Sequence, residues 1–182
     1  MKRIQALLLV AAASSATAGS IPEHLPSDAV PHYQRVNPSL ATAGQPSAPT
    51  VAKLKEMGFR TVVNLRRSDE APEVQKEKAA VEAQGLRYIA IPVTPDTFSP
   101  DDVTAVQRIL EDETAAPVLL HCSSANRVGA VWGVIERRHG RSLADAEAEA
   151  RKIGLSSPAM IDGFRKIAED ARPATESKTI DN

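Results

Sequence analysis

The middle of the chain alternates between short apolar runs and longer stretches in which apolar residues recur at helical spacing. The runs that are short and β-branched enough for buried strands are Thr61–Leu65, Tyr88–Ile91 and Pro117–His121. Two further short strands are expected at Tyr33–Val36 and Leu40–Ala43, on either side of an Asn-Pro turn.

Helices are expected between these strands, where the apolar spacing is bounded by Ser caps and by Gly or Pro stops. They lie at about 51–58, 72–84, 99–110, 127–139, 142–154 and 157–173. Strands that are separated by single helices need crossover connections. The sequence therefore predicts an α/β fold with a central, mostly parallel sheet of about four strands flanked by helices.

This topology points to one edge of the sheet as the functional site. In a parallel α/β sheet, ligands bind beyond the carboxyl ends of the strands. Those ends lie at residues 64–67, 92–96 and 121–127, and the chain's single cysteine, Cys122, falls in the last of them.

The two ends of the chain differ in composition from this middle part. A basic start, an apolar run at 7–13 and small residues before residue 19 predict a secretory signal peptide over residues 1–18. The run is shorter than the roughly 18 residues of a membrane anchor, so we expect a periplasmic or secreted protein with no stable membrane insertion after cleavage. Residues 19–32 are an expected irregular lead-in, 33–173 a single domain and 174–182 a polar, disordered tail.

Charge and composition narrow the function classes. A formal net charge of −1 and a pI near 6.4 leave no broad basic surface, so nucleic acid is not expected as a partner. No metal or other cofactor is expected, because ligand spacing is absent around the four histidines, His24, His32, His121 and His139. A single cysteine excludes an internal disulfide, so Cys122 is either a small buried hydrophobe or a nucleophile.

The residues after Cys122 favour the nucleophile. They offer five successive backbone N–H groups at the start of a helix, and such a loop binds anions. The positive end of the helix favours a Cys122 thiolate, and Arg127 can present a planar fork to two oxygens of a bound oxyanion. The residues expected to bind phosphate are Ser123, Ser124, Ala125, Asn126 and Arg127. Together these parts suffice for covalent phosphoryl transfer.

A proton donor for the leaving group is expected on a neighbouring loop. We predict Asp96, which follows the strand ending at Ile91, although a solvated loop acid explains this residue equally well. Asp69 and Glu70 are a second option, whereas Asp101 and Asp102 fit the first turn of a helix.

Three further residues leave the strands on the same side and are expected to support the site. His121 directly precedes the cysteine, Asn64 could orient the loop by hydrogen bonds, and Arg66 or Arg67 could attract an anionic substrate. Each of them also has a simpler interpretation, as a strand-end residue satisfied by backbone or as a surface residue.

His121-Cys122 followed by a short loop, Arg127 and a helix resembles the signature of protein tyrosine and dual-specificity phosphatases. The segments Leu40–Pro46, Gly58–Arg66 and Gly129–Trp132 resemble a bacterial branch of that superfamily, the phosphatase-like domain also found in beta-lactamase-hydrolase-like proteins. The similarity covers about Tyr33 to Leu155. It implies a cysteine-phosphatase-like fold.

The loop differs from the usual phosphatase signature at three points. Four residues, not five, separate Cys122 from Arg127. Ala125 stands where glycine is usual, so a left-handed conformation is expected at Asn126 instead. Val128 stands where Ser or Thr usually helps the thiolate to leave. The short interval is shared by the bacterial branch and by rhodaneses, which carry a persulfide on a similar cysteine.

Three functions therefore remain in view. The first is a metal-independent phosphomonoesterase of the phosphotyrosine or dual-specificity type, acting through a cysteinyl-phosphate on a phosphorylated small molecule or phosphoprotein. The alternatives are a rhodanese-like sulfurtransferase with a Cys122 persulfide, or a weakly active phosphate-binding module. His121 before Cys122 and the capped loop that holds Asp96 favour the first over the second.

Overall fold

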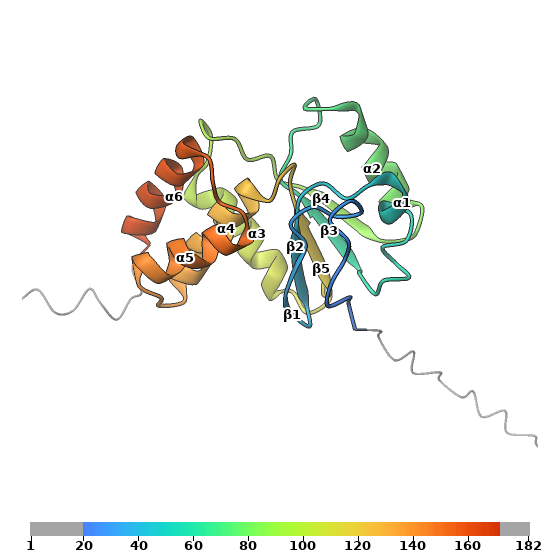
Figure 1. Ribbon diagram of the computed structural model, residues 1–182, viewed down its shortest axis with the longest axis horizontal. Helices are drawn as coiled ribbons and strands as arrows, with labels where there is room; N and C mark the ends of the chain where they lie inside the picture. The colour runs from blue at the N-terminus through green and yellow to red at the C-terminus, as the bar shows by residue number, and fades with distance from the viewer. Residues whose placement is uncertain (1–19, 172–182) are drawn as a thin grey trace, which may run out of the picture.

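A computed structural model describes residues 20–171 of the 182-residue chain (Figure 1). The predicted signal peptide and the predicted tail lie outside these residues. The strands are β1 (Gln34–Asn37), β2 (Leu40–Ala43), β3 (Thr61–Asn64), β4 (Arg87–Ala90) and β5 (Val118–His121). The helices are α1 (Ala48–Val51), α2 (Pro72–Glu82), α3 (Pro100–Glu111), α4 (Asn126–Arg138), α5 (Leu143–Ile153) and α6 (Pro158–Asp170).

The strands form one sheet in the order β1-β2-β5-β3-β4. β2, β5, β3 and β4 run parallel, and β1 adds an antiparallel edge strand through its hairpin with β2. This confirms the predicted α/β class with a core of four parallel strands. β5, which leads into the cysteine, lies between β2 and β3, so its carboxyl end has a neighbour on each side.

Helices cover both faces of the sheet, with α1 and α2 on one side and α3 to α6 on the other (Figure 1). Alternate residues of a strand point to opposite faces, and the core divides accordingly. Val62 and Leu119 join the cluster under α1 and α2, whereas Val63 and Leu120 join the cluster under α3 to α6. Because helices cover both faces, every residue of β2, β3 and β5 is buried. Within residues 20–171, no helix is long and apolar enough to cross a membrane.

The prediction of a helix over 51–58 was wrong, because this span shares only Val51 with the observed helix α1. Only Ala48–Val51 is helical, and the chain continues as turns to Gly58, whose φ is 90°. The N–H groups of Lys53 and Leu54 donate to carbonyls three residues back, at 2.9 and 3.4 Å, which tightens the backbone and ends the α-helix. The apolar spacing reflects burial of Val51 and Leu54 in successive turns.

The other helices begin and end close to the predicted positions. Ser99 caps α3 in a reciprocal capping box with Asp102, and Ser142 accepts the N–H of Asp145 at the start of α5. The left-handed glycines Gly140 and Gly154 follow α4 and α5. The predicted end of α6, at Pro173, lies outside the described residues.

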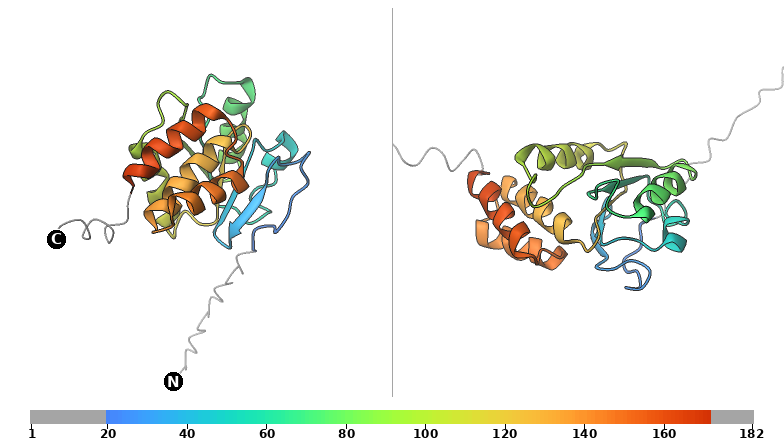
Figure 2. Two further views of the ribbon diagram at one scale, coloured as in Figure 1. Left: turned by 60° about the vertical axis from the view of Figure 1, so that its left-hand side comes forward. Right: turned by 90° about the horizontal axis from the view of Figure 1, so that it is seen from above.

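Helix α4, which starts at the cysteine loop, packs closely between α5 and α6 (Figure 2). Two glycines permit this approach. A Cβ on Gly129 would lie 2.5 Å from the Ala150 oxygen, and one on Gly133 would lie 2.7 Å from both Ala150 Cβ and Phe164 Cε2. The position of α4, and with it the position of Arg127, therefore depends on the small residues of its buried face.

We expect Gly129→Ala to destabilise the protein, because its new methyl group meets backbone atoms that cannot rotate away. Overpacking of this kind costs about 1–3 kcal/mol, against a gain of up to about 1 kcal/mol in helix propensity. The control is Gly163→Ala in α6, where the nearest atom is a side-chain atom, Phe98 Cδ1, at 3.3 Å. Urea unfolding should rank Gly163→Ala as neutral or stabilising; equal free energies of unfolding for the two variants would contradict the packing argument.

Candidate active site

A cavity of about 480 Å³ opens beyond the carboxyl ends of the parallel strands, where the topology predicted a site. Four of the five predicted phosphate-binding residues contribute to its wall. The lining residues are Arg67, Glu70, Val93, Thr94, Pro95, Ser123, Ser124, Asn126, Arg127 and Met160.

Cys122 follows β5 directly and its side chain is fully buried. The loop that it begins is held by the segment after β2. The Cys122 N–H donates to the Ala43 oxygen at 3.3 Å, and the Gln45 N–H donates to the Ser123 oxygen at 2.9 Å. Gly44 lies between these bonds, and a Cβ there would be 3.0 Å from the Ser123 oxygen. The Gly-Gln-Pro segment is thus the support on which the cysteine loop rests.

The left-handed residue of the loop is Ala125, with φ 62° and ψ −2°, and the prediction of Asn126 was wrong. Asn126 is instead the first residue of α4. Its side chain is occupied, since its Oδ1 accepts the N–H groups of Ser156 and Ser157 and its Nδ2 donates to Ser157 Oγ at 2.7 Å. Ala125 fits because its neighbour is Gly154, where a Cβ would lie 2.9 Å from Ala125 Cβ. A left-handed alanine costs about 1–2 kcal/mol, and its buried contacts must offset this.

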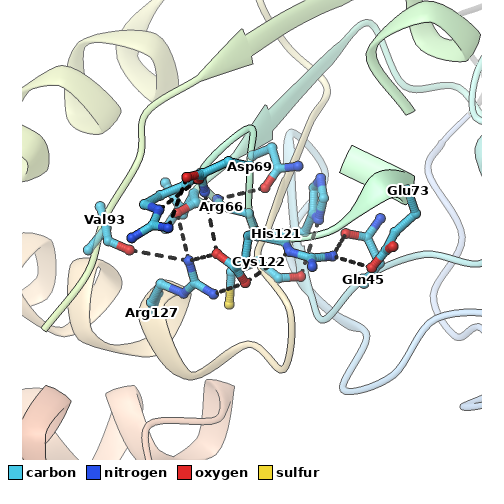
Figure 3. A network of polar contacts seen from close by, with 12 residues as sticks. Gln45, Arg66, Asp69, Glu73, Val93, His121, Cys122 and Arg127 are labelled. Carbon is cyan, nitrogen blue, oxygen red and sulfur yellow. Dashed lines mark hydrogen bonds and ion pairs between the residues drawn. The ribbon is translucent and has the colours of Figure 1, made fainter. Parts of the chain in front are cut away.

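Arg127 is held at the cavity by an unusual number of acceptors (Figure 3). Its Nη1 donates to the Leu65 oxygen and to the Val93 oxygen, both at 3.2 Å, and to Glu70 Oε2 at 2.8 Å. Its Nη2 donates to Glu70 Oε1 at 2.6 Å. Glu70 therefore takes the far end of the guanidinium and leaves the edge formed by Nε and Nη2, the edge suited to two oxygens of an anion.

Electrostatics fix the charge of this pair. Hydrogen bonds from Arg127 lower the pKa of Glu70 from its ordinary 4.5 to about 2, against the opposing effect of burial. Burial lowers the pKa of Arg127, but the bonds to Glu70 and the nearby Cys122 sulfur outweigh it and hold that pKa above its ordinary value. At neutral pH the cavity thus contains a fixed carboxylate and a fixed guanidinium.

The candidate proton donors lie in different settings. Asp96 is exposed on the loop that carries Val93, Thr94 and Pro95, but it is not one of the residues lining the cavity. Glu70 lines the cavity, yet its low pKa keeps it ionised. Asp69 is exposed and bonded to Arg67, which lowers its pKa. Asp102 closes the capping box of α3, as predicted.

The three predicted supporting residues lie together behind the loop rather than in the cavity. Arg66 is 5% exposed and its guanidinium donates to Gln45, Glu70 and Glu73 (Figure 3). It is Arg67, half exposed, that lines the cavity. His121 and Asn64 are fully buried, and both contact Glu77.

Sequence reasoning missed Glu77 and the role of Glu70. A signal for Glu77 exists: Val74, Glu77 and Val81 share the buried stripe of α2, and a carboxylate at an apolar position needs a partner. Nothing in the sequence pairs Glu70 with Arg127, which is 57 residues away. Among residues 20–171, no cluster of three His, Cys, Asp or Glu could hold a metal ion.

The family model described as "Beta-lactamase hydrolase-like protein, phosphatase-like domain" matches residues 32–138. The chain belongs to this family. A beta-lactamase hydrolase-like protein of Xylella fastidiosa is 33% identical over 118 residues, which cover 63% of this chain and 27% of that protein. The dual specificity protein phosphatase TpbA of Pseudomonas aeruginosa is 27% identical over 104 residues, which cover 57% of this chain and 44% of TpbA. The phosphatase-like chain thus matches about a quarter to under a half of these relatives.

Solved structures share the fold of this phosphatase-like chain. Crystal structures of TpbA and of a putative phosphatase from Shewanella putrefaciens both superpose with a TM-score of 0.65, at 22% and 20% identity. They cover 86% and 80% of this chain, and 96% and 97% of their own. A Cys→Ser variant of TpbA in complex with pTyr gives a TM-score of 0.64 at 20% identity, over 90% of this chain and 95% of its own. The cysteine-phosphatase-like fold predicted from the sequence is confirmed.

We expect Glu70→Gln to separate the electrostatic and the catalytic roles of this carboxylate. Its pKa is depressed in the folded state, so the stability it contributes is complete above pH 4.5 and is lost as the pH falls towards 2. Urea unfolding should therefore depend less on pH in this range once Gln replaces it. Turnover of an anionic substrate should also fall, by about 10- to 100-fold in kcat/KM, because the Arg127 fork loses its orientation.

The matched control is Glu147→Gln in α5. Hydrogen bonds from Arg165 and Arg151 hold the pKa of Glu147 at about 2 as well, and Glu147 is not one of the residues lining the cavity. This variant should show the same flatter pH dependence of stability with unchanged turnover. Equal turnover in the two variants would show that Glu70 does not orient Arg127 for turnover.

Proposed function

We propose that the protein is a metal-independent phosphomonoesterase that forms a cysteinyl-phosphate on Cys122. The observation that carries the proposal is the loop between β5 and α4. It places a helix N-terminus and an oriented arginine at one cavity, directly after a buried cysteine. Family membership and the complex of a TpbA variant with pTyr support a phosphorylated substrate of the phosphotyrosine or dual-specificity type.

In the proposed reaction the Cys122 thiolate attacks phosphorus, an S–P bond forms and the P–O bond to the leaving group breaks. The N–H groups of residues 123–127 and the Nε–Nη2 edge of Arg127 hold the equatorial oxygens. Water then attacks phosphorus, which releases phosphate and regenerates the thiolate. The Cys122 side chain is buried in the structure, so the reaction requires that anion binding make the sulfur reachable from the cavity.

Asp96 is the proposed proton donor to the leaving oxygen. It lies on the loop between β4 and α3, one residue after Pro95 of the cavity wall. Thr94 and Thr97 close this loop by a hydrogen bond between their hydroxyl groups at 2.9 Å. The proposal requires a movement of this loop that brings the Asp96 carboxyl to the cavity; the other acid nearby, Glu70, is held ionised by Arg127.

The first test is chemical. The protein should hydrolyse an aryl phosphate at a rate that a chelator does not change, and Cys122→Ser should abolish turnover because it removes the nucleophile. The same preparation should not transfer sulfur from thiosulfate to cyanide at a comparable rate. Sulfur transfer without phosphate release would move the protein to the rhodanese-like class. Anion binding without either reaction would make it a phosphate-binding module.

The second test concerns the proton donor. Asp96→Asn should lower kcat by about 10²–10⁴ for substrates with poor leaving groups, and much less for an aryl phosphate that needs no proton. Asp101→Asn is the control, because Asp101 is also exposed but belongs to the first turn of α3. Unchanged leaving-group dependence in Asp96→Asn would exclude Asp96 as the acid.

A further inference from the structure

The most deeply buried carboxylate near the site belongs to Glu77, on α2, outside every motif that the sequence offered. Its side chain is 2% exposed. It accepts hydrogen bonds from Asn64 Nδ2 at 2.8 Å and from Gln45 Nε2 at 3.0 Å, and its Oε1 lies 3.2 Å from His121 Nε2. The contact with His121 is within ion-pair distance, although the two groups are not aligned for a hydrogen bond.

These three partners come from three adjacent parallel strands. Gln45 follows β2, His121 ends β5, and Asn64 ends β3. Glu77 therefore connects the carboxyl ends of the strands that surround the cysteine loop. Burial of an unpaired carboxylate is costly, so a site with this many donors is built to hold one. Burial, with a smaller electrostatic contribution from Glu77, raises the pKa of the neighbouring Tyr88 to about 12.

Each partner of Glu77 also contacts the catalytic loop or its arginines. His121 Nδ1 lies 3.3 Å from the Cys122 oxygen, and the backbone of Gln45 binds the Ser123 oxygen. The side-chain oxygens of Gln45 and Asn64 both accept from Arg66, at 2.6 and 2.8 Å, and Arg66 binds Glu70. Figure 3 shows Gln45, Arg66 and His121 gathered on the side of Cys122 away from Arg127.

We propose that Glu77 is a positioning residue, which fixes the Cys122 loop through His121 and Gln45. The proposal rests on the proposed phosphatase function for its catalytic meaning. This role also accounts for Gln45 in the Gly-Gln-Pro segment. The Gln45 amide joins the buried Glu77 carboxylate to Arg66, while the Gln45 backbone N–H supports Ser123. Glu77 itself touches neither substrate nor sulfur, so its effect passes through the loop.

The test compares Glu77→Gln with Glu136→Gln. Glu136 is a largely buried carboxylate on α4, paired with Arg141 and remote from the loop. Glu77→Gln keeps the shape of the side chain and should lower kcat/KM for an aryl phosphate by about 100-fold, the effect of a small misplacement of reacting groups. Glu136→Gln should leave kcat/KM unchanged at a similar stability. Wild-type turnover in a folded Glu77→Gln protein would overturn the proposal.

A double-mutant cycle with His121→Asn separates positioning from general stability. If Glu77 acts through His121, adding Glu77→Gln to His121→Asn should lower kcat/KM by less than about threefold further. Independent, multiplying losses would overturn the proposal. If Glu77→Gln does not fold, Gln45→Leu replaces it. Gln45→Leu removes the side-chain amide hydrogen bonds but keeps the backbone N–H that donates to Ser123. Adding Gln45→Leu to His121→Asn should likewise lower kcat/KM by less than about threefold further.

Alkylation of Cys122 provides a measurement that does not require phosphatase activity. Iodoacetamide should modify Glu77→Gln at a rate at least about tenfold different from wild type, with inorganic phosphate no longer protecting, because reactivity follows the local environment of the thiol. Unchanged alkylation and protection would overturn the positioning role. If the wild type hydrolyses no phosphate ester while this difference persists, the proposed function fails and the positioning role stands.

Discussion

The site depends on the close contact between the cysteine loop and the segment that follows β2. Backbone hydrogen bonds join Cys122 to Ala43 and Ser123 to Gln45, so the loop is attached to the end of β2 by backbone contacts alone. This attachment needs Gly44, because a Cβ would meet the Ser123 oxygen. It also sets the start of α4, and therefore the position of Arg127. A parallel sheet makes this possible because the ends of β2 and β5 meet at one edge.

What the sequence could predict is what depends on neighbouring residues. The apolar strands, the Ser caps of α3 and α5 and the glycine stops are local patterns, and the structure has them near the predicted positions. The loop between Cys122 and Arg127 is also a local pattern, and the structure has it between a strand and a helix, as predicted. The failures arose where tertiary contacts override local preference. Asn126 has the better left-handed propensity, yet its amide is needed by Ser156 and Ser157, and Ala125 takes the strained conformation against Gly154.

Contacts between distant segments account for the parts of the site that were not predicted. Glu70 and Arg127 meet because β3 and β5 are neighbours in the sheet, an order that no local pattern encodes. Arg66 or Arg67 was expected to attract an anionic substrate, and Arg66 lies behind the loop, where its guanidinium donates to Gln45, Glu70 and Glu73. Its neighbour Arg67 lines the cavity. The contacts that Arg66 makes with distant residues therefore decide which of the two arginines lines the cavity.

The three carboxylates around the loop show how environment separates residues of the same chemistry. Glu70, held at a pKa of about 2 by Arg127, acts as an anchor for the guanidinium and has no proton to give near neutral pH. Glu77 is buried among donors and does not line the cavity beside the cysteine loop, so it can act there only through the residues it holds. Asp96 is exposed on a short loop at the cavity edge, and no guanidinium binds it among the described residues. A proton donor must be able to hold a proton and to reach the leaving group. Of the three, Asp96 alone is held by neither an ion pair nor a buried network among the described residues, and the position of its loop decides whether it reaches the leaving group.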